Sequence, residues 1–130
     1  PKKVCALLNP LKNSIICVRG NCDSEVDQMV LDFSVLSDSA LLFLNGHTFF
    51  AAHGHLFTEN RQPPLADGDI LLYGHTHVPK FEKRDGHIFI NPGSVSIPKE
   101  NTPNSCIILE DDTVNHCDLY GHVYMENEII

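Results

Sequence analysis

The sequence predicts an α/β or α+β domain in which β-strands dominate and helices are confined to the first third of the chain. Apolar runs bounded by turn residues recur from residue 13 to residue 120, and many occur in pairs joined by a short polar turn. Such strands are expected to pack as a sandwich of sheets. The chain has 130 residues, of which 42% are hydrophobic, so all of it, residues 1–130, fits a single domain with its own core.

The first third of the chain combines the end of a helix, a strand and a short helix. Residues 1–9, PKKVCALLN, carry apolar residues at helical spacing and stop before a proline. Residues 13–21, NSIICVRGN, form a short β-branched run, which is typical of a buried strand that ends in a loop. In the next stretch, CDSEVDQMVLDF, either Asp23 or Ser24 can be the N-cap of a short helix.

The remaining two thirds of the chain are interpreted as strands, most of them joined by hairpins. Three dipeptides mark the expected hairpin turns, and the first is best suited to a type I′ turn because both of its residues accept positive φ. These dipeptides are Asn45-Gly46, Asp85-Gly86 and Asp111-Asp112. Residues 54–69 are polar and contain prolines, which predicts a surface or active-site loop before a strand over residues 70–74.

Composition excludes several classes of protein. The chain has 9 basic and 17 acidic residues and a formal charge of −8, and it lacks the basic cluster that nucleic-acid binding requires. No apolar run reaches the roughly 18–20 residues needed to cross a bilayer, so we expect no membrane association and a cytoplasmic location. The cysteines form no C-x-x-C pair, which argues against a disulfide framework and a structural zinc knuckle. The cysteines, expected to be reduced, are Cys5, Cys17, Cys22, Cys106 and Cys117.

Three predicted strands end in residue types that bind metals. The stretch VRGN ends in Asn21, AAHGH contains His53 and His55, and LLYGHTH contains His75 and His77. Side chains on a strand repeat their direction every second residue, about 6.6–6.8 Å along the backbone, and the ions of a two-metal site lie roughly 3.5–4 Å apart. His75 and His77 can therefore each bind a different ion of one pair. Any one of these histidines alone would more often be a surface or hydrogen-bonded residue, so the prediction rests on the ordered set.

The segments RGNCD, AHGH, YGHTH and INPGS resemble, in order and spacing, the later motifs of the calcineurin-like metallophosphoesterases. The resemblance is greatest to the small bacterial phosphodiesterases of the YfcE type. It implies a metallophosphoesterase-type sandwich of two mixed β-sheets flanked by helices. It also implies that Asn21, His53 and His75 bind one divalent metal ion and that His77 binds the other. Histidine and asparagine suit manganese, zinc, iron or nickel, and manganese is favoured.

The earlier motifs of that family, Asp-x-His and Gly-Asp, do not occur before Asn21. The chain is therefore expected to be the C-terminal portion of a metallophosphoesterase domain, truncated at its N-terminus. A second difference follows the asparagine, where many relatives have a histidine that donates a proton and this sequence has Cys22. The catalytic proton donor stays open between Cys22 and His55, and His55 is favoured because a thiol donates only weak hydrogen bonds.

Further residues are candidates for weaker roles around the site. Arg19 can contact the phosphate of a substrate or be a solvated surface residue. Asp23 can orient a residue of the site or cap the helix that follows it. Asn91 and Ser94, within INPGS, are interpreted as a tight turn, from which Ser94 can hydrogen-bond the neighbouring histidine loop. The remaining histidines are expected to face solvent, and these are His47, His87, His116 and His122.

The sequence thus predicts a metal-dependent phosphodiesterase, in which two metal ions lower the pKa of a water molecule that attacks a small-molecule phosphodiester in line. Two alternatives come from other classes of protein. One is a non-catalytic interaction scaffold on the same fold, as in the retromer subunit that resembles phosphoesterases, although that type has lost the asparagine ligand that Asn21 would supply. The other is a sheet protein with one structural zinc ion, for which asparagine is a poor ligand. The sequence is compatible with a homo-oligomer.

Overall fold

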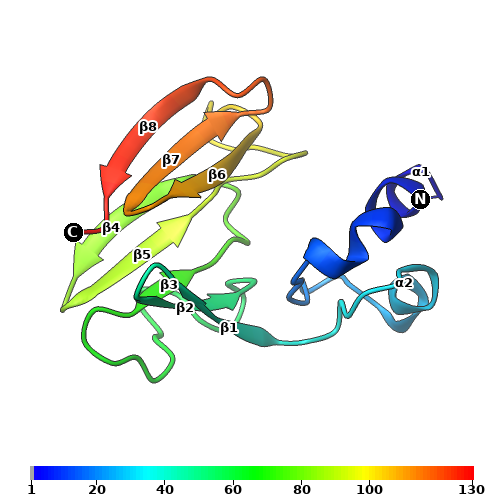
Figure 1. Cartoon of the computed structure of the whole chain (residues 1–130), viewed down its shortest axis with the longest axis horizontal. Coiled ribbons are helices and arrows are strands. Elements are labelled where there is room, and N and C mark those ends of the chain that lie inside the picture. Colours follow the sequence, from blue (N-terminus) through cyan, green and yellow to red (C-terminus); the bar gives the residue numbers. More distant parts are fainter. Residues whose placement is uncertain (1) are drawn as a thin grey trace.

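A computed structural model describes residues 2–130, in which two β-sheets form layers and the helices lie beside them (Figure 1). The helical elements are α1 (Lys2–Leu8), the 3-10 helix η1 (Asn9–Ser14) and α2 (Glu25–Val30). The strands are β1 (Ser39–Leu44), β2 (His47–Ala52), β3 (Ile70–Leu72), β4 (Lys80–Arg84), β5 (His87–Asn91), β6 (Ser105–Glu110), β7 (Thr113–Asp118) and β8 (Val123–Glu128). Helices are confined to the first third of the chain, as predicted; Pro1, the first residue of the expected helix, lies outside the described residues.

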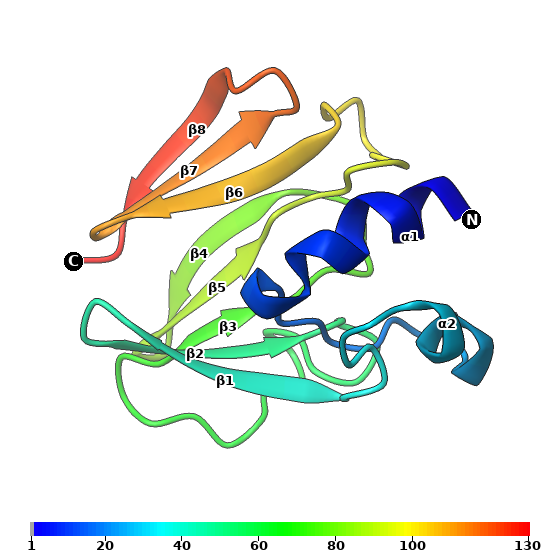
Figure 2. The same ribbon diagram turned by 45° about the vertical axis from the view of Figure 1, so that its right-hand side comes forward.

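The first sheet has the strand order β1-β2-β3-β5-β4 and mixes parallel with antiparallel pairs. β2, β3 and β5 run parallel to one another, whereas β1 and β4 are antiparallel edge strands. The second sheet, β6-β7-β8, is antiparallel throughout. Of the two sheets expected to be mixed, only the first is, because short hairpins connect all strands of the second. Figure 2 shows the second sheet stacked over the first, with α1 and α2 toward the end of the first sheet at which β2 and β3 terminate.

The main core lies between the two sheets, and a smaller core lies on the opposite face of the first sheet. The residues buried between the sheets are Phe49, Ile70, Ile88, Ile90, Val114 and Ile129. On the opposite face, Leu71, Tyr73 and Phe89 are buried, and Leu65 from the 54–69 loop packs against them. Neighbouring residues of β3 and β5 are therefore buried on opposite faces, which explains why these parallel strands are apolar throughout. The packing on both faces fixes the strands from which the histidine loops emerge.

All three predicted hairpins are confirmed by the strand pairing. The dipeptides Asn45-Gly46 and Asp85-Gly86 have positive φ at both positions, between 52° and 79°, as a type I′ turn requires. Asp111, in the third turn, has a φ of 51°. Each turn residue type tolerates this conformation, so the positive φ follows from the local sequence, although Asn45 Nδ2 also donates a hydrogen bond to the Asp111 carbonyl oxygen over 2.9 Å.

Two expectations about individual segments are wrong, and one strand was not predicted. Residues 15–19 are not assigned to a strand and join neither sheet within the described chain, since an apolar run forms a strand only where another backbone pairs with it. β8 is absent from the sequence prediction because VYMENE contains acidic residues that disguise its alternation. His116, expected to face solvent, is 0% exposed, because β7 directs it toward the first sheet.

Two further observations concern membrane-spanning helices and the cysteines. Among residues 2–130, no helix combines the length and apolar character that crossing a membrane requires. All five cysteines are free thiols, as expected. Cys22 is the exposed member of this set, and the others are partly or fully buried.

Candidate functional site

Two loops that contain histidines meet at the edge of the first sheet where β2 and β3 end. They are residues 53–55 and residues 74–77, and the second is called the histidine loop. His53 follows β2 and His75 follows β3, and because these strands are parallel their carboxyl ends lie at the same edge. The Gly74 N–H donates a hydrogen bond to the His53 carbonyl oxygen over 2.7 Å, which joins the two loops. Gly54 permits this approach, since a Cβ atom there would lie 2.6 Å from the Gly74 carbonyl oxygen. Its φ of +111° is also one that side chains disfavour.

The three side chains expected to bind one ion lie together at this edge. His53 Nε2 is 3.0 Å from Asn21 Oδ1 and 3.1 Å from His75 Nδ1. The rings of His53 and His75 make an edge-to-face contact, with centroids 5.0 Å apart. Burial lowers the pKa of His53, and the neighbouring His75 and His55 lower it further, so the His53 ring is neutral at pH 7. Neutral imidazole is the form in which histidine binds metals.

The backbone of His75 is held in an unfavourable conformation. Its φ is +70°, and the Thr76 N–H donates a hydrogen bond to the Gly74 carbonyl oxygen over 2.9 Å. A bond across one residue with a positive central φ describes the rarer, strained form of γ-turn. His77 also has a positive φ, of 63°. Such conformations persist in larger residues only where surrounding contacts hold them, and they concentrate at functional sites.

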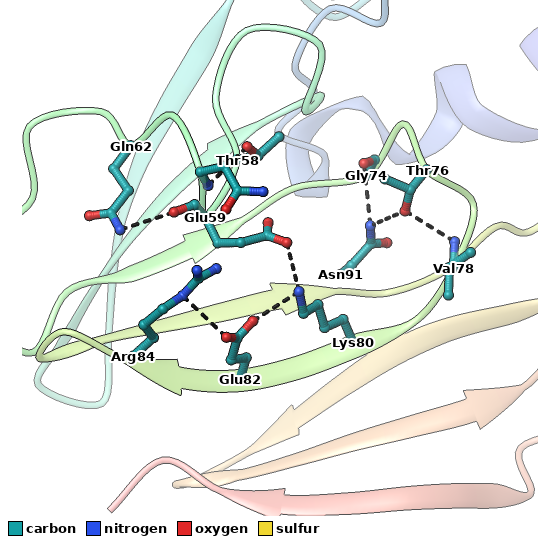
Figure 3. A network of polar contacts seen from close by, with 11 residues as sticks. Thr58, Glu59, Gln62, Gly74, Thr76, Val78, Lys80, Glu82, Arg84 and Asn91 are labelled. Atoms are coloured by element: carbon teal, nitrogen blue, oxygen red, sulfur yellow. Dashed lines mark hydrogen bonds and ion pairs between the residues drawn. The ribbon is translucent and has the colours of Figure 1, made fainter.

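The side chain of Asn91 contacts this turn directly (Figure 3). Its Nδ2 donates to the Gly74 carbonyl oxygen over 3.3 Å and to Thr76 Oγ1 over 2.9 Å. Its Oδ1 accepts a hydrogen bond from the Gly93 N–H over 2.9 Å. Asn91 is 1% exposed, so water competes little for these bonds. Asn91 therefore orders both its own turn and the histidine loop.

His77 is oriented by a contact with the segment that follows β5. Its Nδ1 donates a hydrogen bond to the Ile97 carbonyl oxygen over 2.7 Å, which makes Nε2 the lone-pair nitrogen of the neutral ring. Ser94 Oγ accepts a hydrogen bond from the Ile97 N–H over 3.0 Å. Ser94 therefore orders the segment that His77 contacts, and the bond from Ser94 to the histidine loop that the sequence allowed is not formed among the described residues.

The loop before α2 brings Asn21 to the histidines. The Asp23 carboxylate accepts a hydrogen bond from the Gly20 N–H over 2.6 Å, which closes the loop around Asn21. The alternative that Asp23 caps the helix is wrong, because Ser24 occupies the N-cap position and forms a capping box. Arg19 Nε donates to the Asp23 carbonyl oxygen over 3.2 Å, so this loop also fixes the base of the Arg19 guanidinium.

Both candidate proton donors are exposed at the margin of this cluster. The centroid of the His55 ring lies 5.4 Å from that of His53 and 6.3 Å from that of His75. Cys22 follows Asn21 directly in the chain. Either group can therefore meet both solvent and a ligand bound at this edge.

The cluster offers a partial set of metal ligands. Among residues 2–130, the side chains of histidine, cysteine, aspartate and glutamate form no group of three or more that could hold an ion. The convergent set consists instead of two histidines and an asparagine. Since four or more donors usually surround a transition-metal ion, Asn21, His53 and His75 fit such an ion when water, substrate oxygens or further carboxylates complete its coordination.

A network of charged side chains lies near the histidine loop (Figure 3). It was not predicted from the sequence. Lys80 Nζ lies 2.6 Å from Glu59 Oε1 and 2.8 Å from Glu82 Oε2. Arg84 Nε lies 3.1 Å from Glu82 Oε1. Burial opposes the ionisation of Glu59, yet hydrogen bonds from Lys80 and Tyr73 lower its pKa to about 2. Lys80 is the stronger of these two influences on the pKa, and Glu59 Oε2 has no hydrogen-bond partner among residues 2–130.

The available signal for this network was the alternation of charges along β4. Residues 80, 82 and 84 share one face of the strand, and their charges alternate in sign. A cavity of about 380 Å³ lies between Glu59, Lys80 and Thr76, next to the histidine loop. A larger cavity, of about 460 Å³, lies around the Asp85-Gly86 turn at the opposite end of the sheet. The histidine cluster lies at the first of these two ends, so cavity size alone does not locate the site.

The chain resembles known proteins over most of its length. A family model for the calcineurin-like phosphoesterase superfamily domain matches residues 2–114. Phosphodiesterase YfcE of Escherichia coli (strain K12) is 45% identical over 115 residues, which are 88% of this chain and 62% of YfcE. The chain therefore spans less than two thirds of the length of this curated relative.

Two solved structures extend the comparison. YfcE, described as a phosphoesterase from E. coli, matches with a TM-score of 0.93 at 40% identity, over 98% of this chain and 71% of that one. Wild-type Vps29 from Entamoeba histolytica, complexed with Zn²⁺, matches with a TM-score of 0.51 at 18% identity, over 100% of this chain and 90% of that one. The second match shows a shared fold alone.

Proposed function

Because the chain belongs to the calcineurin-like phosphoesterase superfamily, we propose that its domain acts as a metal-dependent phosphodiesterase. The proposed substrate is a small-molecule phosphodiester, and the proposed cofactors are two divalent ions, with manganese favoured. One observation carries the proposal. Asn21 Oδ1, His53 Nε2 and His75 Nδ1 converge, with 3.0 Å and 3.1 Å between neighbouring atoms. The similarity to a protein named phosphodiesterase supports the substrate class.

The donor chemistry suits divalent transition-metal ions. Asn21, His53 and His75 would hold one ion through an amide oxygen and two ring nitrogens. His77 would hold the other through Nε2, because its Nδ1 donates to the Ile97 carbonyl oxygen. Histidines that bind metals commonly donate their other ring N–H to a carbonyl or carboxylate, which fixes the tautomer and the ring orientation. The neutral state of His53 supports the same assignment.

When bound, two divalent ions would offset charge on the phosphate oxygens and lower the pKa of the attacking water. The remaining roles belong to side chains at the margin of the cluster. The exposed guanidinium of Arg19 contacts a phosphate oxygen while its Nε stays bonded to the Asp23 carbonyl oxygen. His55 donates a proton to the leaving oxygen, since its exposed ring lies beside that of His53.

The proposal is tested by measuring how fast the purified protein hydrolyses bis(p-nitrophenyl) phosphate with and without added Mn²⁺. Asn21→Ala and His75→Ala should each lose on the order of 100-fold or more of the activity, because each removes a ligand. His122→Ala, which changes an exposed histidine in the turn before β8, is the matched control and should keep full activity. Parallel titrations with Zn²⁺, Fe²⁺ and Ni²⁺ would rank the metals.

Two outcomes would contradict the proposal. Turnover that needs no divalent ion, or that survives Asn21→Ala, would show that the cluster is not the reaction centre. A protein that binds Mn²⁺ yet hydrolyses neither the diester nor p-nitrophenyl phosphate would favour the non-catalytic scaffold on the same fold.

The assignment of the proton donor has its own test. Cys22→Ser should keep most of the phosphodiesterase turnover, because a thiol is a poor hydrogen-bond donor. His55→Ala should lose on the order of 100-fold, the usual contribution of a general acid. The reverse ranking of the two variants would assign the role to Cys22.

A further inference from the structure

A buried polar contact connects the second sheet to the histidine loop. His116 lies on β7 and is 0% exposed, and its Nε2 donates a hydrogen bond to the Asn91 carbonyl oxygen over 2.8 Å. Asn91 ends β5, and its side chain donates to the Gly74 carbonyl oxygen and to Thr76 Oγ1. Asn91 thus bonds to the second sheet with its backbone and to the strained turn with its side chain.

Burying a histidine destabilises a fold unless its polar atoms have partners. Burial lowers the pKa of His116, and the contact with Asn91 opposes this effect only in part, so the ring is neutral. When Nε2 is the donor, Nδ1 is a lone-pair acceptor, and it has no hydrogen-bond partner among residues 2–130. A leucine of similar volume would avoid this cost. A histidine at this buried position is therefore explained by the hydrogen bond that its Nε2 donates, because an apolar side chain would serve packing alone.

A second buried contact fixes the residues that follow Asn91. Ser105, 1% exposed, donates a hydrogen bond from Oγ to the Pro92 carbonyl oxygen, and the same Oγ lies 2.6 Å from the Tyr124 hydroxyl. Since the Ser105 hydrogen is used for Pro92, the Tyr124 hydroxyl is the donor of the second bond. A Cβ atom on Gly93 would lie 3.0 Å from Ser105 Oγ, so the turn packs closely on this group. Asn91 and Pro92 are thus bonded to β7 and β6, and β8 supports the second of these bonds through the contact of Tyr124 with Ser105.

We propose that His116 is a positioning residue for the metal-binding histidine loop. Through the Asn91 carbonyl oxygen it fixes the backbone from which the Asn91 amide reaches the turn around His75. Without that support the strained turn can relax to a negative φ, and the His75 ring then moves away from His53. The inference rests on the proposed function, because His75 needs this placement only if His53 and His75 bind the same metal ion.

The test compares His116→Leu with His116→Gln. Glutamine can place its amide nitrogen near the position of Nε2 and still donate to the Asn91 carbonyl oxygen, whereas leucine fills a similar volume without a donor. Val114→Ala, on the same strand and in the same core, controls for lost packing alone.

Two properties of the purified protein are measured, namely its affinity for Mn²⁺ and the rate of hydrogen exchange at the Thr76 amide. We expect His116→Leu to weaken Mn²⁺ binding on the order of 10-fold in calorimetric titrations. We also expect it to speed hydrogen exchange of the Thr76 amide on the order of 10-fold, because the turn opens more often. His116→Gln should stay close to wild type in both readouts, and Val114→Ala should leave both unchanged.

The wild-type protein supplies a measurement that needs no variant. The ¹⁵N chemical shifts of the His116 ring should show the tautomer protonated at Nε2, and protonation at Nδ1 alone would overturn the inference. It also fails if His116→Leu leaves Thr76 exchange at the wild-type rate, or if His116→Gln behaves as the leucine variant does. If the wild-type protein binds no Mn²⁺, the proposed function fails, and Thr76 exchange alone then decides for or against His116 as a positioning residue.

Discussion

The two ends of the five-stranded sheet both contain backbone with positive φ, but for different reasons. At the hairpin end, positive φ falls on residues that adopt it readily. Those residues are Asn45-Gly46 and Asp85-Gly86. At the histidine end, where β2 and β3 terminate, it falls not only on Gly54 but also on the larger residues His75 and His77. The hairpin end follows from local sequence, whereas the histidine end depends on contacts from distant residues such as Asn91.

This difference shows where the fold exchanges stability for placement of side chains. A larger residue held at positive φ costs on the order of 1–3 kcal/mol, and the hairpin end avoids most of that cost through its choice of residues. At the histidine end the turn brings His75 Nδ1 to 3.1 Å from His53 Nε2. A relaxed turn would separate these atoms, so the strain and the candidate site belong together.

The largest effect is expected from Gly54→Ala, which attacks the histidine end. The new Cβ would lie 2.6 Å from the Gly74 carbonyl oxygen, at a φ of +111°, so the two loops must move apart. We expect the free energy of unfolding to fall by about 3–4 kcal/mol and Mn²⁺ binding to be lost. Urea denaturation and calorimetric titration measure the two effects.

Gly46→Ala is the matched control at the hairpin end. Its φ is +78°, but no heavy atom of the described chain outside its immediate neighbours lies within 4 Å of the new Cβ. The expected loss is about 1 kcal/mol, from the backbone conformation alone, with Mn²⁺ binding intact. Equal losses in the two variants would show that the ends of the sheet do not differ as described.

The next effect in size is the response to metal. Mn²⁺ at 100 times its dissociation constant should raise the free energy of unfolding by about 2.7 kcal/mol if it binds only the folded protein. Hydrogen exchange followed by mass spectrometry should show new protection over residues 74–77 and none at Asn45-Gly46. Asn21→Ala should remove both effects, and protection spread evenly over the sheet would contradict a site at the histidine end.

The sequence was sufficient for the features that depend on local chemistry. The hairpin turns are correct because Asn-Gly and Asp-Gly adopt positive φ readily between two strands. The meeting of His53 and His75 could also be anticipated, because each follows a strand of one sheet and parallel strands end at a common edge. The sequence could not supply the γ-turn at His75, because that conformation is held by Asn91, which lies 15 residues after Thr76.

His116 is the clearest error, and a signal for it was present. It lies two residues after Val114 on β7, and alternate residues of a strand share a face. Val114 is 1% exposed, so the same face carries His116 into the core. The hydrogen bond that makes this burial tolerable goes to Asn91, 25 residues earlier in the chain, and no local pattern indicates it.

Acid should destabilise the histidine end of the sheet before the hairpin end. The expected change in the free energy of unfolding is smaller than the change caused by Mn²⁺. The pKa of Glu59 is lowered from 4.5 to about 2, because hydrogen bonds from Lys80 and Tyr73 outweigh the opposing effect of burial. The folded-state pKa lies below the unfolded one, so this stabilisation is complete above pH 4.5 and is lost as the pH falls toward 2. Lys80 is 38% exposed, and solvent screening limits the contribution to about 1–2 kcal/mol.

Glu59→Gln measures that contribution directly. The variant should lose stability at pH 6 but much less at pH 2.5, which lies well below the unfolded-state pKa of 4.5 and close to the folded-state pKa of about 2, so that most of the stabilisation is already lost. Urea denaturation at both values gives the difference, and hydrogen exchange over the 54–69 loop locates it. A variant whose stability falls with acid as steeply as that of the wild type would show that Glu59 is not the responsible group.

The smallest effect, and the most direct measure of strain, is the difference between His75→Gly and His75→Ala. Both variants lose the imidazole and should lose Mn²⁺ binding equally, but only glycine adopts the φ of +70° at this position without steric cost. Part of that gain is offset by the greater freedom of glycine in the unfolded chain, so we expect the glycine variant to be more stable by about 0.5–1 kcal/mol.

Asp85→Gly, at a φ of 56° in the hairpin end, should stay within about 0.5 kcal/mol of wild type, because aspartate already tolerates that conformation. If His75→Gly is no more stable than His75→Ala in urea denaturation, the turn is not strained, and the contrast between the two ends of the sheet would then lie in their side chains alone.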